Sequence, residues 1–178
     1  MTSQKRITLG EVRSLIRNIL LENLYDLSEL GKITCVQGST HVMQTCVLDN
    51  NKFFLKFSRG DDPLEATNRS LQTMVEWLAY RVYALYPGVD IPAAIHLAWD
   101  PDKRAVGIAT QGVKGDKNQH LAPKELARRL TAGVYVDIFL ANWDVVAPGN
   151  VIIAGKQAVR IDPGGSMTFR AQGARKGD

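Results

Sequence analysis

The sequence predicts an α+β fold in which an antiparallel sheet of about five strands packs on one large helix, with a smaller region after it. Three observations predict this. Short apolar segments separated by turn signals occupy residues 32–57 and 94–110. A long segment with helical periodicity, residues 64–86, lies between them. A second helical segment, residues 123–140, precedes a hairpin that is flanked by carboxylates.

Composition limits the possible functions. The chain has 178 residues, of which 45% are apolar and 22% are charged, as in ordinary globular proteins. Long apolar runs and a signal-peptide core are both missing, so we expect no membrane contact. The net charge of +4 suits a phosphate-bearing ligand but is too weak to predict nucleic-acid binding. With only two cysteines, Cys35 and Cys46, we expect a buried, reduced pair and a cytoplasmic protein.

The first 30 residues are predicted to carry an amphipathic helix. Thr8 and Glu11 match a capping box, and the helix is expected to run to about Tyr25. Its apolar face, which we expect to pack on the sheet, consists of Leu9, Val12, Leu15, Ile16, Ile19 and Leu20.

Residues 31–112 are predicted to form the first lobe. The expected strands are 32–36, 42–48, 52–57, 94–98 and 105–110, and Asp49-Asn50-Asn51 is a hairpin signal. The apolar side of the helix between them is predicted to be Leu71, Met74, Val75, Leu78, Ala79, Val82 and Leu85.

Residues 113–178 are predicted to form a reduced second lobe. Residues 114–119 are polar and expected to be exposed. Strands 151–153 and 158–161 are expected to meet at a turn at Gly155. We expect the tail, residues 170–178, either to be a loose terminus or to fold over a ligand. The helix at 123–140 is expected to bury Leu126, Leu130, Val134, Ile138 and Phe139.

Lys56 and Glu76 are candidate site residues. Lys56 lies within an apolar strand, where burial is costly unless an anion meets the ammonium. An edge-strand Lys that faces water is the alternative. Glu76 is the candidate partner on the long helix, and Glu65, nearer the helix start, competes with it. Either Glu is equally compatible with a solvated helix surface.

Three polar residues flank the predicted hairpin. One Asn carbonyl and one carboxylate, from Asn150 and Asp162, suit Mg²⁺ and leave room for phosphate oxygens. A separate carboxylate, Asp144, can accept the proton of an attacking hydroxyl. The alternative makes Asp144 a helix cap and places the other two in ordinary turns.

A turn with Gly38 and Ser39 separates the first two strands. Glycine permits close approach of a phosphate, and hydroxyl or N–H groups can bind it, although a plain hairpin is the alternative. The three histidines are scattered, which speaks against a zinc site. No Gly-x-Ser-x-Gly elbow and no P-loop motif occurs, which excludes two other common enzyme classes.

In this order the segments resemble small kinase-like domains of phage and bacterial proteins, in the group of HipA-like kinases and the phosphoinositide 3/4-kinase-like superfamily. The resemblance covers roughly residues 32–172. It is carried by Gly38-Ser39-Thr40, Phe54-Leu55-Lys56-Phe57, Glu76–Tyr83, Leu140–Asp144 and Arg160–Gly165. It implies a protein-kinase-like fold with a five-stranded N-lobe and a reduced C-lobe.

The resemblance also implies a function, an ATP- and Mg²⁺-dependent transfer of phosphate to a hydroxyl of a protein or small molecule. Transfer of AMP at the same site is a variant. The implied roles are phosphate binding by Lys56, anchoring of Lys56 by Glu76, catalysis by Asp144, Mg²⁺ binding by Asn150 and Asp162, phosphate covering by Gly38 and Ser39, and adenine contact by the backbone from Gln111 to Val113.

The chain departs from the kinase pattern at four points. Asn142-Trp143 replaces His-Arg, the span from Asp144 to Asn150 is one residue longer than usual, and Pro-Gly-Gly follows Asp162. Only sixteen residues follow Asp162. We therefore expect a minimal domain, a piece of a longer protein, or a non-catalytic kinase-like module that binds or inhibits a partner protein. If the chain is phage-encoded, we expect it to act in the host cytoplasm.

Overall fold

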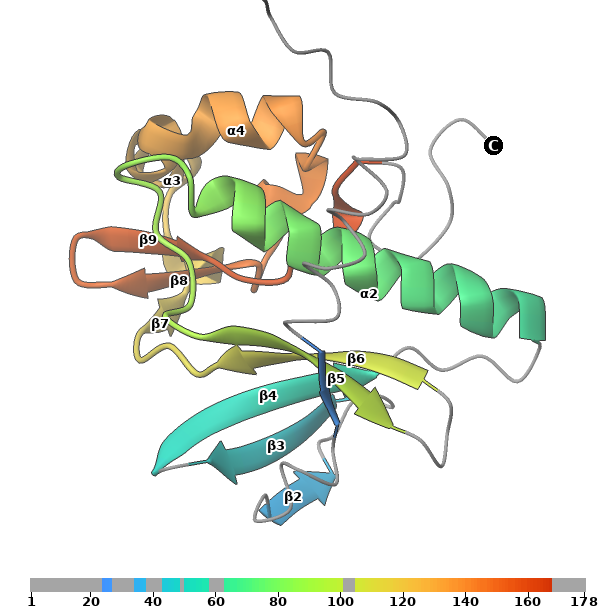
Figure 1. Ribbon diagram of the computed structural model, residues 1–178. Helices are drawn as coiled ribbons and strands as arrows, with labels where there is room; N and C mark the ends of the chain where they lie inside the picture. Colours follow the sequence, from blue (N-terminus) through green and yellow to red (C-terminus); the bar gives the residue numbers. More distant parts are fainter. Residues whose placement is uncertain are drawn as a thin grey trace, which may run out of the picture.

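The computed structural model describes residues 24–26, 34–37, 43–48, 50–57, 63–100 and 105–167. The predicted α+β class is confirmed, with two sheets and few helices (Figure 1). One sheet has the strand order β1-β5-β6-β4-β3-β2, and the other has the order β7-β8-β9. The strands are β1 (Leu24–Asp26), β2 (Thr34–Gln37), β3 (Met43–Leu48), β4 (Asn51–Phe57), β5 (Ile95–Asp100), β6 (Ala105–Gln111), β7 (Asp116–Lys117), β8 (Val151–Ala154) and β9 (Gln157–Arg160). The α-helices are α2 (Pro63–Tyr83), α3 (Pro123–Leu130) and α4 (Val134–Phe139), and the 3-10 turns are η1 (Asn118–His120), η2 (Thr131–Gly133), η3 (Trp143–Val146) and η4 (Pro163–Gly165).

The five predicted strands of the first lobe are all present and pair antiparallel, as expected. A sixth strand, β1, pairs parallel with β5. The sequence predicted helix as far as Tyr25, so this prediction is wrong for Leu24 and Tyr25. Parallel pairing with the edge of β5 gives hydrogen-bond partners to backbone groups of these residues. This pairing outweighs the helical periodicity of the sequence. The rest of the predicted N-terminal helix, the turn at Gly38 and Ser39, and the tail 170–178 lie outside the described residues.

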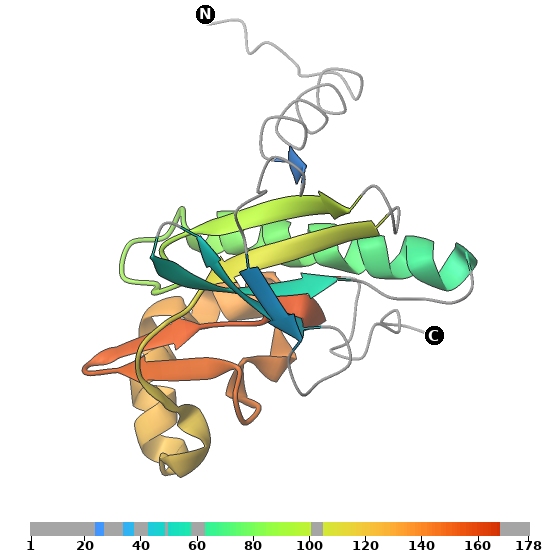
Figure 2. The same ribbon diagram turned by 90° about the horizontal axis from the view of Figure 1, so that it is seen from below.

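Helix α2 covers one face of the six-stranded sheet, which lies in front of it in Figure 2. The buried face of α2 is aromatic, because Trp77 and Tyr80 pack on Leu97 and Ile108 of the sheet. The predicted apolar side is wrong in part, since its leucines are exposed: Leu71, Leu78 and Leu85. Aromatic side chains bury more area than leucine, so the helix turns them inward. None of the helices in the described ranges, α2 included, has the length and apolar character needed to cross a membrane.

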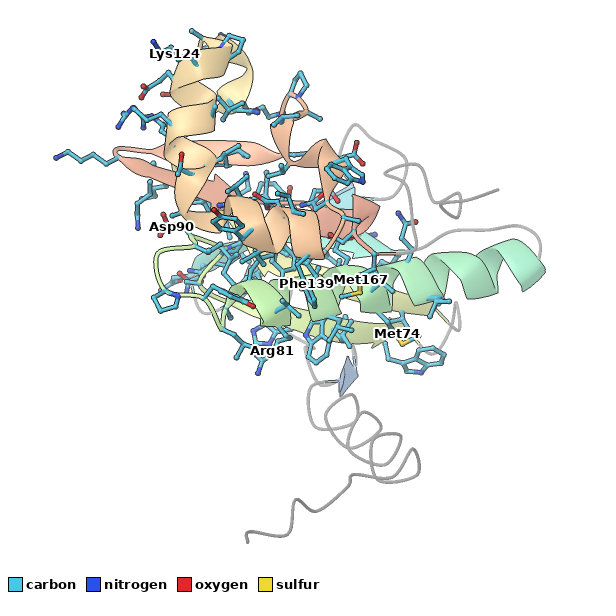
Figure 3. All side chains as sticks on the ribbon, turned by 90° about the horizontal axis from the view of Figure 1, so that it is seen from above. Met74, Arg81, Asp90, Lys124, Phe139 and Met167 are labelled. Atoms are coloured by element: carbon cyan, nitrogen blue, oxygen red, sulfur yellow. The ribbon has the colours of Figure 1, made fainter. Side chains whose placement is uncertain are left out.

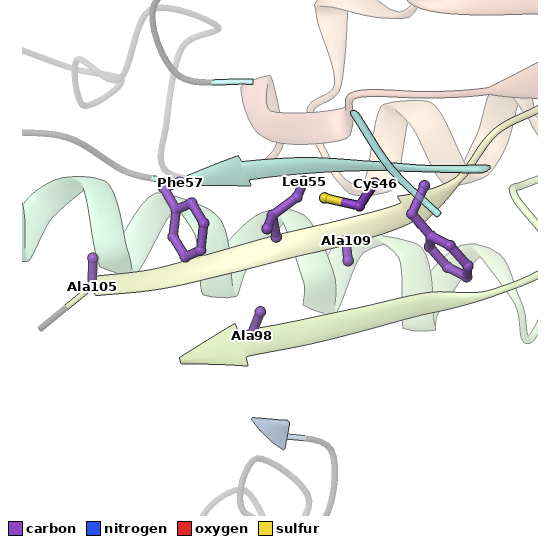
Figure 4. Close-up of a cluster of buried hydrophobic side chains, with 7 residues drawn as sticks. Cys46, Leu55, Phe57, Ala98, Ala105 and Ala109 are labelled. Atoms are coloured by element: carbon purple, nitrogen blue, oxygen red, sulfur yellow. The ribbon is translucent and has the colours of Figure 1, made fainter. Parts of the chain in front are cut away.

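A second layer of apolar side chains covers the other face of the same sheet (Figure 4). It contains Leu55 and Phe57 of β4, whereas Phe54 and Lys56 point to the α2 side because side chains alternate along a strand. The register sets Lys56 opposite Ile108 and Phe54 opposite Thr110. The strand pattern therefore turns Lys56 toward α2.

The predicted helix 123–140 is broken. It forms α3, the 3-10 turn η2, and α4, and the break lies at Gly133. The Arg160 guanidinium occupies the space where a Cβ of residue 133 would lie, and its Nη2 donates to the Leu130 carbonyl at 3.0 Å. After the break, Val134, Ile138 and Phe139, predicted to be buried, are exposed, whereas Val136 and Leu140 are buried. Figure 3 labels Phe139 at the end of α4.

The prediction of reduced cysteines is also wrong. Cys46 is buried, as expected, but it is disulfide-bonded. The register of β2 on β3 places Cys35, the only other cysteine of the sequence, opposite Cys46. Because disulfides are rare in reducing compartments, the cysteines no longer support a cytoplasmic location.

Candidate functional site

Lys56 lies between two carboxylates. Its Nζ is 2.6 Å from Oε2 of Glu76 and 2.7 Å from Oδ1 of Asp162. The three residues, here called the Lys56 cluster, come from β4, from α2 and from the segment after β9. The fold thus brings together three of the predicted site residues that lie far apart in the sequence.

The position of β4 in the sheet decides whether the Lys56 side chain faces water or the interior of the protein. Strand β4 lies between β3 and β6, so the alternative of an edge-strand Lys facing water is wrong. Glu76 is only 3% exposed, although helix sequence alone gave no reason to bury it. A carboxylate buried this deeply requires a cationic partner, and Lys56 supplies it. Glu65, the competing candidate, lies in α2, but its side chain is outside the described residues.

The cluster contains two carboxylates and one ammonium. Burial alone would lower the pKa of Lys56, but the attraction of Glu76 and Asp162 outweighs it, so the pKa lies above its ordinary value. Burial raises the pKa of Glu76 to about 7, helped by Asp162 and opposed by Lys56. Lys56 therefore stays charged, while Glu76 changes its charge near neutral pH.

Asp162 is held in a left-handed conformation, with φ 55° and ψ 59°. This conformation is uncommon for a residue other than glycine, and it persists only where neighbours fix it. The Asp162 N–H donates to the Tyr80 hydroxyl at 2.9 Å. The next turn passes close to the cluster, since a Cβ at Gly164 would lie 3.1 Å from Oε2 of Glu76. Tyr80 and the glycine turn together position the Asp162 carboxylate.

The predicted hairpin, β8 and β9, connects Asn150 to Asp162. The Ile161 N–H donates to the Asn150 carbonyl at 2.9 Å, so both polar residues lie at the open end of the hairpin. The Asn150 side-chain Nδ2 donates to the Asp144 carbonyl at 2.9 Å. The turn η3, which contains Asp144, packs against η4. The structure thus places Asp144, Asn150 and Asp162 in adjoining segments.

A pocket of about 300 Å³ opens beside the Lys56 cluster, between the two sheets. It includes both residues that the resemblance assigns to adenine, Gln111 and Val113, whereas Asp144 and Asn150 are not part of its wall. Its lining consists of Phe54, Lys56, Glu76, Tyr80, Ile108, Thr110, Gln111, Val113, Lys117, Gly149, Ile152, Ile161 and Asp162. Because Lys56 pairs with Ile108, Gln111 lies three residues, roughly 10 Å, farther along β6. The pocket is therefore mainly apolar, with the Lys56 cluster at one end and Lys117 as a further charged residue in its wall.

A buried network supports this site from the second lobe. Asp137 accepts hydrogen bonds from Nε and Nη2 of Arg160 at 2.9 and 2.8 Å, and from the Tyr83 hydroxyl at 2.7 Å. Nδ2 of Asn142 donates to the Tyr83 hydroxyl at 2.9 Å. Arg160 is two residues before Asp162, and Asn142 is two residues before Asp144. The network thus fixes the start of both segments that carry the predicted catalytic and metal-binding residues.

The oxygen atoms at the hairpin end fit Mg²⁺, the metal that the resemblance implies. The Asp162 side chain is 54% exposed and uses Oδ1 for Lys56, so Oδ2 remains for a metal. Asn150 uses its Nδ2 for Asp144, so its Oδ1 remains as well. The described ranges contain no group of three or more His, Cys, Asp or Glu that could hold a metal. One carboxylate and one amide oxygen suffice where phosphate oxygens and water complete the coordination.

Several residues of the site were missed by sequence reasoning. Tyr80 lies four residues after Glu76 on α2, and this spacing places both side chains on one helix face, so it offered a usable signal. Asn118 was expected to be exposed with the rest of 114–119 but is buried, because it hydrogen-bonds the Ala147–Gly149 turn. Asp137 and Arg160 offered no signal, since their pairing requires the break at Gly133.

Comparison with known proteins assigns no family to this chain. No protein-family model matches the sequence, and no curated protein matches it. The site geometry alone therefore carries the functional argument.

Proposed function

We propose that this chain is an ATP- and Mg²⁺-dependent phosphotransferase with a kinase-like fold, acting on a hydroxyl of a protein or small molecule. One observation carries the proposal. Lys56 is held by a buried Glu on a helix and by an Asp after a hairpin, at the charged end of an apolar pocket. A flat apolar base and a polyanionic tail, as in ATP, match such a pocket.

The residues of the chain have distinct tasks in this proposal. Lys56 exchanges its contact with Asp162 for phosphate oxygens, while the buried Glu76 keeps the ammonium in place. Asp162 and Asn150 would hold Mg²⁺, which neutralises phosphate charge when bound. Asp144 accepts the proton of the acceptor hydroxyl as the new O–P bond forms and the bond from the γ-phosphorus to the bridging oxygen breaks. ADP leaves with that electron pair.

The test is a calorimetric titration of ATP with and without Mg²⁺ into the wild type, Asp162→Ala and Lys56→Met. The proposal expects binding that requires both Mg²⁺ and Asp162. Lys156→Met, at the exposed turn between β8 and β9, is the matched control for loss of a positive charge. Mass spectrometry of the acceptor then separates phosphate transfer from AMP transfer. In AMP transfer the acceptor oxygen bonds to the α-phosphorus, the bond from the α-phosphorus to the oxygen bridging it to the β-phosphorus breaks, and pyrophosphate leaves. Full turnover by Asp162→Ala would refute the proposal.

A second candidate function, a non-catalytic module that binds a partner protein, is favoured by a different observation. The outer side of α4 and η3 exposes large apolar side chains, with Tyr135 81%, Phe139 74% and Trp143 66% exposed. Large apolar side chains exposed on two elements that contact each other often mark a protein contact. The same titration distinguishes the candidates, since a wild type that binds no ATP with Mg²⁺ supports the binding module.

A further inference from the structure

A second cation lines the pocket and has no task in the proposed reaction. Lys117 belongs to β7 of the three-stranded sheet, whereas Lys56 belongs to the six-stranded sheet. The antiparallel register sets Lys117 directly opposite Ile152. Directly opposed residues point to the same face of a sheet, and Ile152 lines the pocket. The strand pairing therefore aims Lys117 into the pocket.

The next residue, Asn118, fixes the backbone that carries Lys117. Its Nδ2 donates to the Ala147 carbonyl at 3.1 Å, and its Oδ1 accepts from the Gly149 N–H at 2.7 Å. Asn118 is only 3% exposed, so water does not compete for these bonds. The start of η1 is thereby attached to the turn that precedes Asn150.

The side chain of Lys117 extends over this turn. A Cβ at Gly149 would lie 3.9 Å from both Cδ and Nζ of Lys117. The segment from Asp144 to Asn150 contains only Val, Val, Ala, Pro and Gly between its ends, so it carries no cation of its own. Lys117 brings a positive charge to a turn that otherwise lacks one.

The two lysines differ in how their charges are balanced. Lys56 has two carboxylates within 2.7 Å. Within the described ranges Lys117 forms no ion pair. An ammonium without a counter-charge at the wall of a pocket attracts an anionic ligand group.

We propose that Lys117 is a second phosphate-binding residue and that it makes the pocket prefer phosphorylated nucleotides over the nucleoside. This inference rests on the proposed function, because it takes the ligand to be a nucleotide. Loss of one charge-assisted hydrogen bond at a partly exposed site weakens binding about tenfold. Lys117→Met should therefore weaken ATP and ADP about tenfold and leave adenosine unchanged.

The experiment is a calorimetric titration of adenosine, AMP, ADP and ATP, each with Mg²⁺, into four proteins. These are the wild type, Lys117→Met, Lys117→Arg and the control Lys114→Met, which removes an exposed Lys outside the pocket wall. Lys117→Arg should keep the preference, and Lys114→Met should bind like the wild type. The first nucleotide in the series that loses affinity in Lys117→Met identifies the phosphate that Lys117 contacts.

Two results would overturn the inference. Unchanged affinity of Lys117→Met for ATP would show that the charge is not used. Equal weakening of adenosine and ATP would show that Lys117 only shapes the wall. A wild type that binds none of the four ligands would instead refute the proposed function, so the two failures are distinguishable. Thermal melting of each variant confirms that it is folded.

Discussion

Replacing Arg160 measures how strongly the buried network stabilises the fold. Arg160→Met removes the two hydrogen bonds that Asp137 accepts at 2.9 and 2.8 Å and leaves the carboxylate with the Tyr83 hydroxyl. The side chains of the ion pair are 3% and 7% exposed, so water cannot replace the guanidinium. Breaking a buried pair on one side costs about 3–5 kcal/mol, and we expect a loss of this size in the free energy of unfolding.

A double-mutant cycle with Asp137→Asn isolates the charge pairing. Asp137→Asn leaves the Arg160 charge buried beside a neutral amide, so it should cost about as much as Arg160→Met. The double variant buries no charge and should lose no more stability than either single variant. Glu125→Gln, in the more exposed ion pairs with Arg128 and Arg129, is the control and should change the stability much less.

Urea denaturation followed by tryptophan fluorescence gives the four free energies of unfolding. The reasoning fails if the losses of the two single variants add in the double variant, because the charges would then act independently. It also fails if Arg160→Met costs less than about 1 kcal/mol, the value of an ordinary hydrogen bond.

Three further predictions test individual contacts. The pKa of Glu76, about 7, lies above its ordinary 4.5, so the folded state binds more protons between these values, and stability should fall as pH rises from about 4.5 to about 7. In denaturation at several pH values Glu76→Gln should remove this slope, and an unchanged slope would contradict the assignment. Tyr80→Phe removes the acceptor of the Asp162 N–H and should lower stability by about 0.5–1.5 kcal/mol and weaken Mg²⁺-dependent ATP binding. Stability lost with unaltered ATP binding would mean that Tyr80 does not position Asp162. Gly133→Ala places a Cβ in the space of the Arg160 guanidinium and should lower stability by about 1–3 kcal/mol in thermal melting, whereas a neutral effect would show that Arg160 can move aside.

The sequence predicted the strands of the first lobe well, because each alternates over a few residues and ends at a turn signal. The hairpin of β8 and β9 was predicted for the same reason. The helices were predicted with the wrong buried faces. For α2 the leucines formed the more regular stripe, yet Trp77 and Tyr80 pack on the sheet and Tyr83 packs on Val136 and Leu140 of the second lobe. The hydroxyl groups of the two tyrosines also form hydrogen bonds there.

The candidate site was predictable only where one residue type is unusual in its local setting. Lys56 is such a residue, since a charge in an apolar strand requires an explanation. Arg160 offered no such signal, because its partner Asp137 lies beyond a helix break that no local pattern indicates. Lys117 was hidden among exposed polar residues, and only the register with Ile152 separates it from its neighbours. Long-range pairings of this kind are decided by packing, so sequence periodicity alone does not predict them.

Helix α2 explains why these separate contacts form one site. Glu76, Tyr80 and Tyr83 follow each other at spacings of four and three residues, so their polar ends form a row along one helix face. Glu76 binds Lys56 of the sheet, Tyr80 binds the backbone of Asp162, and Tyr83 binds the network of the second lobe. A rotation of α2 that turned its leucines inward would break all three contacts together. The orientation of α2 therefore meets two demands at once: its aromatic face buries more area than the leucines would, and the same face aligns the parts of the pocket.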